Sequence, residues 1–147
     1  MYKNLLVATD GSKLSDKAVA HAIGLARAVG ATITAFYAAP DYPMPAYADG
    51  IVYEPVSRKE YAKLAAQDAD KILSKVVAKA KAAGVACKTA FEIANTPWEA
   101  ILTAAKRNKV DAIVMASHGP RGLSAVLLGS ETQKVLTHTK LPVLVVR

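Results

Sequence analysis

Hydrophobic residues follow two alternating patterns along the chain. Short runs in which nearly every position is apolar are typical of strands buried on both faces of a sheet. Longer segments with an apolar residue every three or four positions are typical of helices with one buried face. The predicted strands are residues 4–9, 31–38, 85–93, 111–117 and 141–146. The predicted helices are residues 14–29, 57–83, 96–108 and 130–138.

Polar residues and glycines mark the ends of these helices. Ser12 is a candidate N-cap, and Gly30 follows the last turn of the same helix. Residues 57–60 and 130–133 match the capping-box pattern, in which a serine caps the helix and a longer side chain reaches back. Residues 96–99 combine a threonine cap with proline at the first helical position. Each predicted helix therefore has its own start signal.

The alternation of strands and helices predicts an α/β fold with a single domain over residues 1–147. We expect one open, parallel, five-stranded sheet with helices on both faces, in a Rossmann-like arrangement. Such sheets bind ligands outside the carboxyl ends of their strands, where the winding direction reverses. If the first strand lies beside the fourth, residues 10–12 and 117–130 form that place.

Residues 40–55 break the alternation. This segment contains three tyrosines and four prolines, and we expect it to be a long loop without regular structure. Long loops inside compact domains are often functional. The sequence leaves two interpretations open, a flap near the ligand site and a variable surface loop.

Composition narrows the class of protein. A chain of 147 residues with 52% hydrophobic residues and charges of both signs is typical of one globular domain and excludes a disordered chain. The apolar runs are much shorter than the roughly 20 residues needed to span a membrane. The first residues lack the pattern of a secretory signal, and the single Cys87 has no internal partner for a disulfide. We therefore expect a cytoplasmic protein that does not enter a membrane.

The formal net charge of +7 suggests an anionic partner, either a nucleic acid or a smaller polyanion such as a nucleotide. The basic residues are scattered along helical segments, as at Lys71, Lys75, Lys79 and Lys81, which is typical of a solvated helix face. No compact basic run is interleaved with aromatic residues. The pattern therefore disfavours nucleic-acid binding.

The segment after the fourth predicted strand contains the main candidate chemistry. Residues 116–132 include Gly119, Gly122 and Gly129, three of the eight glycines in the chain. Glycine lets the backbone approach a ligand closely, and the helix expected to start at Ser130 offers unpaired N–H groups that attract phosphate. The segment is therefore a candidate phosphate site. The alternative is that these glycines only form turns.

Two common nucleotide motifs are absent. Gly129 and Ser130 lack the lysine and the spacing of a P-loop. Residues 9–12 follow the first strand without the three glycines of a dinucleotide fingerprint. Both a P-loop hydrolase and a dinucleotide oxidoreductase are therefore disfavoured.

Two motifs give the chain a resemblance to the universal stress protein family over essentially its whole length. Residues 5–12 read Leu-Leu-Val-Ala-Thr-Asp-Gly-Ser, and the C-terminal part pairs Gly129-Ser130 with a Pro-Val-Leu-Val-Val ending at residues 142–146. ATP-binding members share a G-x2-G-x9-G-[ST] pattern, which Gly119 and Gly129-Ser130 fit. Ala116 stands where that pattern has its first glycine, so we expect a shifted phosphate or weaker selectivity rather than loss of binding.

The resemblance implies an adenine-nucleotide-hydrolase-like strand order of 3-2-1-4-5 and a site for ATP. Asp10 would accept hydrogen bonds from the ribose or adenine, and Ala38 would lie against the adenine. The loop after the fourth strand would wrap the phosphates, which would share a Mg²⁺ ion that keeps several waters. The next helix would present amides and hydroxyls to them. The implied binding residues are Ala8, Thr9, Asp10, Ala38, Ala116, Ser117, His118, Gly119, Pro120, Arg121, Gly122, Gly129, Ser130, Glu131 and Thr132.

Several of these residues have a second interpretation. Asp10 could only form a turn with the residues that follow it, and Arg121 could be a solvated charge. We expect His118 to contact phosphate or solvent rather than to act as an acid or base. Because Ser117 and His118 are adjacent, their spacing does not form a catalytic relay. We expect Trp98 to contribute to packing.

The last predicted strand suggests how the protein associates. Pro142 lies near its start, and proline within sheets is mostly confined to edges and strand starts. Residues 143–146 could pair with the same strand of a second copy about a two-fold axis. The family resemblance implies the same homodimer, and a monomer with a short edge is the alternative.

Three functions remain open at this stage. The first is a dimeric, ATP-binding regulatory module of the stress response. The second is a slow ATPase or phosphotransferase, for which the sequence offers only Asp10, His118 and Arg121 as chemical groups. The third is a nucleotide-free interaction protein, which Ala116 favours and the retained glycines disfavour.

Overall fold

The computed structural model describes residues 1–43, 46–53, 56–119 and 128–147. The strands are β1 (Asn4–Ala8), β2 (Thr32–Pro40), β3 (Ala46–Ala48), β4 (Ile51–Tyr53), β5 (Cys87–Ala94), β6 (Ala112–Ala116) and β7 (Val143–Val146). The helices are α1 (Lys13–Val29), α2 (Arg58–Ala82), α3 (Pro97–Arg107) and α4 (Ser130–His138). Within the described residues, no helix is both long and apolar enough to cross a bilayer.

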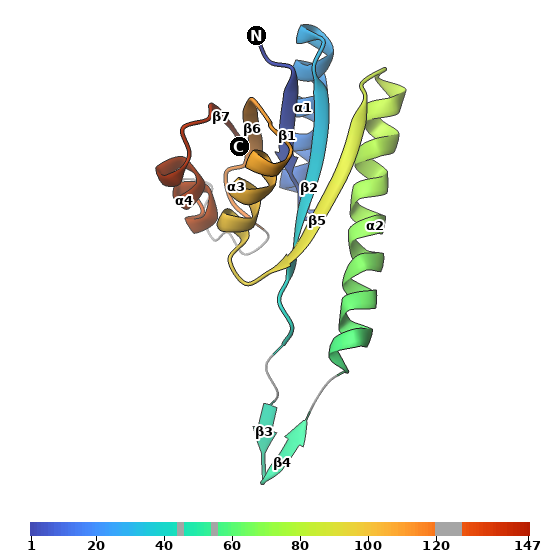
Figure 1. Ribbon diagram of the computed structural model, residues 1–147, viewed down its shortest axis with the longest axis vertical. Coiled ribbons are helices and arrows are strands. Elements are labelled where there is room, and N and C mark those ends of the chain that lie inside the picture. Colours follow the sequence, from blue (N-terminus) through green and yellow to red (C-terminus); the bar gives the residue numbers. More distant parts are fainter. Residues whose placement is uncertain (44–45, 54–55, 120–127) are drawn as a thin grey trace.

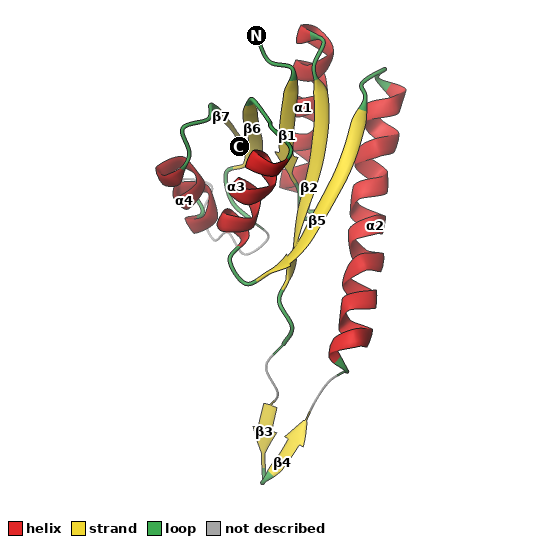
Figure 2. Cartoon of the chain, viewed as in Figure 1, coloured by secondary structure: helices red, strands yellow, loops and turns green. Residues whose placement is uncertain are grey.

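The central sheet is parallel and has the order β5-β2-β1-β6-β7 (Figure 1). This confirms the predicted order 3-2-1-4-5, because the hairpin strands β3 and β4 lie outside the sheet. The helices α1 and α2 cover one face, and α3 and α4 cover the other (Figure 2). The prediction of an open five-stranded sheet with helices on both faces is therefore confirmed.

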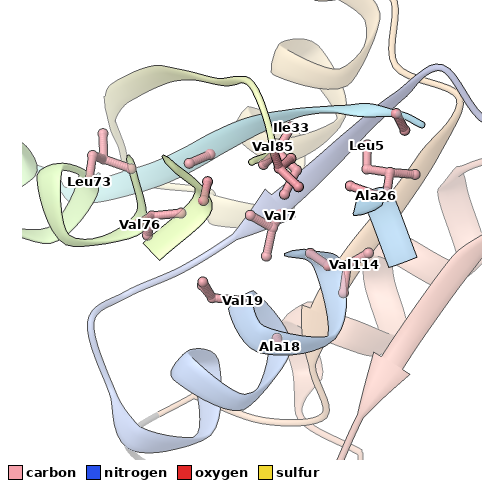
Figure 3. Packing of buried hydrophobic residues seen from close by; sticks show 14 of the residues in the cluster. Leu5, Val7, Ala18, Val19, Ala26, Ile33, Leu73, Val76, Val85 and Val114 are labelled. Atoms are coloured by element: carbon pink, nitrogen blue, oxygen red, sulfur yellow. The ribbon is translucent and has the colours of Figure 1, made fainter. Parts of the chain in front are cut away.

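Alternation along β1 explains why the sheet has a core on each face. Leu5 and Val7 are fully buried against α1 and α2, whereas Leu6 points into the cluster formed with α3. Figure 3 shows Leu5, Val7 and Val114 of the sheet beside residues of α1 and α2. The small side chains on α1 let this helix lie close to the strands. Those fully buried on α1 are Ala18, Ala22 and Ala26.

Two helix starts agree with the sequence prediction. The side chain of Ser12 accepts a hydrogen bond from the backbone N–H of Ser15, and the side chain of Ser57 accepts one from Glu60. Gly30 ends α1 with a φ of 72°, a left-handed conformation that glycine adopts without strain. These caps fix where α1 and α2 begin.

The other two helix starts differ from the prediction. Thr96 occupies the N-cap position of α3, but its side chain makes no capping hydrogen bond. Instead, Glu131 of α4 accepts a hydrogen bond of 2.8 Å from the backbone N–H of Trp98. Ser130 is the first residue of α4 and not its cap, because Gly129 takes the N-cap position. The capping box predicted at residues 130–133 is therefore wrong by one residue.

The prediction that residues 40–55 lack regular structure is also wrong. Strands β3 and β4 pair in an antiparallel hairpin, closed by Asp49 and Gly50 with φ angles of 52° and 75°. Positive φ at both central residues is the signature of a tight hairpin turn, and Asp-Gly is one of its preferred sequences. Residues 44–45 and 54–55 of the segment lie outside the described residues.

Candidate functional site

The loops after β1 and β6 meet at the carboxyl edge of the sheet. Both strands run parallel with Val7 opposite Val114, so both loops leave the sheet on the same side. A Cβ atom placed on Gly119 would lie 3.8 Å from the Oδ2 atom of Asp10. The structure therefore brings together the two loops on which the sequence placed the ligand.

Asp10 is held by a turn that leaves part of its carboxylate accessible. Its Oδ1 atom accepts a hydrogen bond of 2.8 Å from the N–H of Ser12. Its side chain is exposed, and the Oδ2 atom faces Gly119. Asp10 therefore forms the turn considered in the sequence analysis and still offers an oxygen to a ligand.

Thr9 supports the same turn from inside the protein. It is 6% exposed, and its hydroxyl lies 3.1 Å from the hydroxyl of Ser15 and accepts a hydrogen bond from the N–H of Gly11. The sequence analysis did not identify Ser15, which is buried on the first turn of α1. These contacts give Thr9 a structural role below the edge of the site.

The end of β6 is fastened to the start of α4. Ser117 O accepts a hydrogen bond of 2.7 Å from the N–H of Gly129, and the hydroxyl of Thr132 donates to the carbonyl oxygens of Ala116 and Ser117 at 3.1 Å. A Cβ atom on Gly129 would lie 3.0 Å from Cα of His118, closer than real Cβ atoms normally approach. A side chain here would require the helix start or the strand end to move by a few tenths of an ångström.

The start of α4 differs from the other helix starts. α1 and α2 are capped by their own serines and α3 by Glu131, whereas the N-cap of α4 is Gly129, which has no side chain. In the described part of the chain, the N–H groups of residues 130–132 have no hydrogen-bond partner. Unpaired N–H groups and the helix dipole together favour an anion at this position.

The side chains at this helix start are partly committed to the protein itself. Glu131 binds the start of α3, and Thr132 is 2% exposed with its hydroxyl on the end of β6. What these two residues can offer a ligand is their backbone N–H. Ser130 is exposed, so its hydroxyl is available as well.

Ser117 and His118 form a local pair. The Ser117 hydroxyl lies 3.1 Å from Nδ1 of His118, and Ser117 is 4% exposed. No hydrogen bond among the described residues joins His118 to a carboxylate. The pair therefore lacks the third member of a hydrolytic triad, as the sequence analysis expected.

The remaining predicted site residues fall into three places. Ala8 and Ala38 are half-buried at the rim of the cluster that contains α3 and Trp98. Ala116 packs on the opposite face, against the cluster formed with α1 and α2. The other predicted residues lie outside the described part of the chain. They are Pro120, Arg121 and Gly122.

A hollow beside the turn of Asp10 was not predicted from the sequence. It has a volume of about 300 Å³ and lies between α1, α2 and the end of β2. Burial raises the pKa of the Tyr37 hydroxyl, and the negative charges of Asp68 and Asp10 raise this pKa further. The lining residues are Thr9, Gly11, Asp16, Tyr37, Asp68, Lys71, Ile72 and Lys75. The sequence analysis assigned Lys71 and Lys75 to a solvated helix face, and no local pattern indicates the hollow.

The sequence matches known proteins over its full length. The model of the universal stress protein family matches residues 1–147. A universal stress protein from Thermus aquaticus is 35% identical over 147 residues, covering 100% of both chains. The universal stress protein YxiE from Bacillus subtilis is 34% identical over 153 residues and also covers 100% of both.

Solved structures agree with these sequence matches. Protein MJ0577 aligns with a TM-score of 0.80 at 24% identity, covering 99% of this chain and 96% of the other. A universal stress protein in complex with cAMP aligns with a TM-score of 0.71 at 28% identity, covering 99% and 97%. One from Archaeoglobus fulgidus in complex with dAMP aligns at 0.69 with 18% identity, covering 99% and 98%. With the family match over every residue, the chain belongs to the universal stress protein family.

Proposed function

We propose that this protein binds an adenine nucleotide, as Mg-ATP, between the loops that follow β1 and β6. The observation that carries this proposal is the start of α4, where three N–H groups lack a partner within the described residues, beside a glycine loop. Relatives in complex with cAMP and with dAMP support the same ligand class. The bound nucleotide would serve a regulatory module of the stress response.

The residues present fit a nucleotide in size and polarity. Ala8 and Ala38 are small, half-buried side chains on the same face of the sheet, which suits the packing of a flat ring. The Oδ2 atom of Asp10, which faces Gly119, can accept hydrogen bonds from ribose hydroxyls or the adenine amino group. The N–H groups of residues 130–132 can donate to phosphate oxygens.

Mg²⁺ fits the site as an ion brought by the phosphates. The described residues contain no group of three or more His, Cys, Asp or Glu side chains placed to hold a metal. Mg²⁺ in such sites is commonly held by phosphate oxygens and waters. When bound, the ion would neutralise phosphate charge, while Asp10 and the start of α4 orient the nucleotide.

The geometry gives less support to the second function, a slow ATPase or phosphotransferase. Such an enzyme needs a group positioned to orient the attacking water or hydroxyl. One oxygen of Asp10 is held by Ser12, and Nδ1 of His118 lies against the Ser117 hydroxyl. The third function, a nucleotide-free interaction protein, rests on Ala116 in place of the first motif glycine.

We also propose that the protein forms a homodimer through the edge strand β7. Leu144 on this strand is 41% exposed and borders an apolar hollow of about 510 Å³ between α1 and β7. The other residues around this hollow are Ala20, His21, Gly24 and Leu25. Pairing of two β7 strands would cover both the open edge and this apolar surface. The cytoplasmic location expected from the sequence stays a prediction.

The experiment that tests nucleotide binding begins with the protein as it is purified. The protein is denatured, and the small molecules it releases are identified by mass spectrometry. Release of an adenine nucleotide in near-equimolar amount is the expected result. Formation of ADP after addition of Mg-ATP then separates a binding module from an ATPase. Absence of released nucleotide, together with no binding of added Mg-ATP, would favour the nucleotide-free interaction protein.

A further inference from the structure

One carbonyl group at the end of β6 holds the first turn of α4 at two points. The carbonyl oxygen of Ser117 accepts a hydrogen bond of 2.7 Å from the N–H of Gly129 and one of 3.1 Å from the hydroxyl of Thr132. Gly129 is the N-cap of α4, and Thr132 is the third residue of this helix. The two donors therefore lie at opposite ends of the first turn, and both attach it to the strand.

The hydroxyl of Thr132 is buried and bound to the strand end. It lies 3.1 Å from the carbonyl oxygen of Ala116 as well as from that of Ser117, and Thr132 is 2% exposed. A hydroxyl has one proton to donate, so the two carbonyl oxygens share it. The side chain of Thr132 is therefore occupied inside the protein, and only its backbone N–H is left to donate to a ligand.

The strand end that accepts these hydrogen bonds is itself fixed in the sheet. The N–H of Ser117 donates to the carbonyl oxygen of Val146 in β7 at 2.8 Å, and Ser117 is 4% exposed. Ala116 pairs with the same Val146 in parallel register. Groups attached to a buried, regular element are held more precisely than groups on a loop. The sheet therefore provides a fixed reference for the start of α4.

The turn held in this way carries the N–H groups that are proposed to bind phosphate. Among the described residues, those of positions 130–132 have no hydrogen-bond partner. An N–H···O hydrogen bond is strong only over donor–acceptor distances of about 2.7–3.2 Å, so a shift of the turn by roughly 0.5 Å would weaken several of them together. Asp10 and Ala38 lie on other elements, so such a shift would not move them.

We propose that Thr132 is a positioning residue for the phosphate part of the nucleotide. Its buried hydroxyl sets the place of the first turn of α4 relative to the end of β6, and so sets the affinity for phosphate without touching the ligand. This inference rests on the nucleotide site proposed above. Loss of the hydroxyl therefore lowers the affinity for a nucleotide that carries phosphates and leaves the affinity for adenosine unchanged.

The test compares two ligands by calorimetric titration, Mg-ATP directly and adenosine by its displacement of Mg-ATP. Thr132→Val replaces the hydroxyl by a methyl group and is expected to weaken Mg-ATP binding roughly tenfold or more, as loss of an outer-shell partner does at metal sites. The affinity for adenosine is expected to stay the same. Thr132→Ser and Thr132→Ala form a second pair that differs only in the hydroxyl. The serine variant is expected to bind Mg-ATP nearly as wild type does, and the alanine variant to show the selective loss.

Two further threonines provide matched controls. Thr34 is fully buried in β2, and its hydroxyl donates to Oδ1 of Asn4 at 3.1 Å. Thr137 lies on α4 itself, and its hydroxyl donates to the carbonyl oxygen of Gln133 at 2.8 Å. Thr34→Val removes a buried hydroxyl elsewhere, and Thr137→Val removes one from the same helix. Both are expected to bind Mg-ATP and adenosine like wild type.

The outcomes separate this inference from the proposed function. If wild type binds Mg-ATP and the folded valine and alanine variants bind it equally well, Thr132 does not position the site, although the site stands. An equal loss of adenosine and Mg-ATP affinity, or a serine variant as weak as the alanine variant, would also overturn the inference. A wild type that binds neither ligand would overturn the proposed function and this inference with it.

Discussion

At Gly129, two backbone segments touch without room for a side chain. A Cβ atom there would meet the Cα of His118 at 3.0 Å, and the same glycine donates its N–H to Ser117. This contact sets the position of the α4 N–H groups relative to the loop after β6. A larger residue at this position would therefore shift the proposed phosphate site by a few tenths of an ångström.

Gly129→Ala is expected to lower the free energy of unfolding by about 1–3 kcal/mol, because backbone must shift to admit the methyl group. Urea denaturation measures this change. Gly24→Ala is the control, since an added Cβ meets nothing within 4 Å on the helix α1. That control is expected to raise stability by about 0.5–1 kcal/mol. Equal effects of the two substitutions would contradict this account of Gly129.

Asp111 joins two backbone segments at the amino ends of the strands, opposite the candidate site. Its carboxylate accepts hydrogen bonds from the backbone N–H groups of Lys3 and Asn4, and so joins the start of β1 to the start of β6. These two hydrogen bonds lower the pKa of Asp111 below its usual value. The ionised carboxylate is therefore the form that stabilises the fold.

Asp111→Asn is expected to cost about 1–2 kcal/mol at pH 7. Because the pKa is lower in the folded protein, the stabilisation is complete above the unfolded pKa of roughly 3.9 and is lost as the pH falls through the folded value. Urea denaturation at pH 7 and near pH 3 measures the difference between wild type and variant. That difference is expected to shrink at the lower pH. A difference that stays constant would show that the charge of Asp111 does not matter.

At the scale of elements, α3 and α4 share one acidic residue. Glu131, in the first turn of α4, accepts the hydrogen bond from Trp98 at the start of α3, and Trp98 stacks on His138 at 4.3 Å between ring centres. The two helices are therefore held together at both ends of α4. This arrangement keeps the first turn of α4 in place without a cap of its own.

Glu131→Ala is expected to lower the free energy of unfolding by about 1–2 kcal/mol, as loss of a charged helix cap does. Thermal unfolding followed by circular dichroism gives the measurement. Lys134→Ala serves as its control, because Lys134 only meets Glu131 at 4.0 Å on the surface and is expected to change stability by less than about 0.5 kcal/mol. A Glu131→Ala variant as stable as Lys134→Ala would argue against the shared cap.

The sequence predicted the sheet well because its information is local and periodic. The strands of the sheet are short, largely apolar runs, and each helix has a regular stripe, so the parallel α/β class follows from the alternation. The strand order came from the family resemblance. The β3–β4 hairpin was missed because its strands have three residues each, and the prolines around them conceal the Asp49-Gly50 turn. Its exposed apolar faces give no amphipathic signal.

The candidate site was predictable in position and less so in detail. Parallel register explains why Asp10 and Gly119 meet, since both follow strands that end on one edge. The sequence placed the cap of α4 at Ser130 because residues 130–133 fit a capping box. In the structure the cap is Gly129, whose N–H donates a hydrogen bond to the carbonyl oxygen of Ser117. Glu131 caps a helix start 33 residues away, a contact that no local pattern encodes.

At the scale of the whole molecule, the two open edges of the sheet are the candidate contact surfaces for a second copy. The strands β5 and β7 are the two edges, and each carries one exposed apolar residue, Phe91 at 42% and Leu144 at 41%. Only Leu144 lies beside the apolar hollow of α1. We therefore place the proposed dimer contact on β7.

Leu144→Lys is expected to weaken the β7 contact at least tenfold, because it puts a charge at the centre of the proposed interface. Sedimentation velocity over a range of protein concentrations measures the change. The matched control is Phe91→Lys on the opposite edge, which is expected to sediment like wild type. If both variants sediment like wild type, or if Phe91→Lys alone dissociates the protein, the β7 dimer is wrong.

The central claim is that Mg-ATP binds between the loops after β1 and β6, and calorimetric titration tests it most directly. Wild type is expected to bind with micromolar affinity. Gly119→Val and Asp10→Asn are expected to weaken binding at least tenfold. Asn keeps an oxygen for the turn at Ser12 but loses the charge. Asp70→Asn, exposed on α2, is the control and is expected to bind normally. No heat from nucleotide-free wild type, or unchanged binding by both site variants, would contradict the claim.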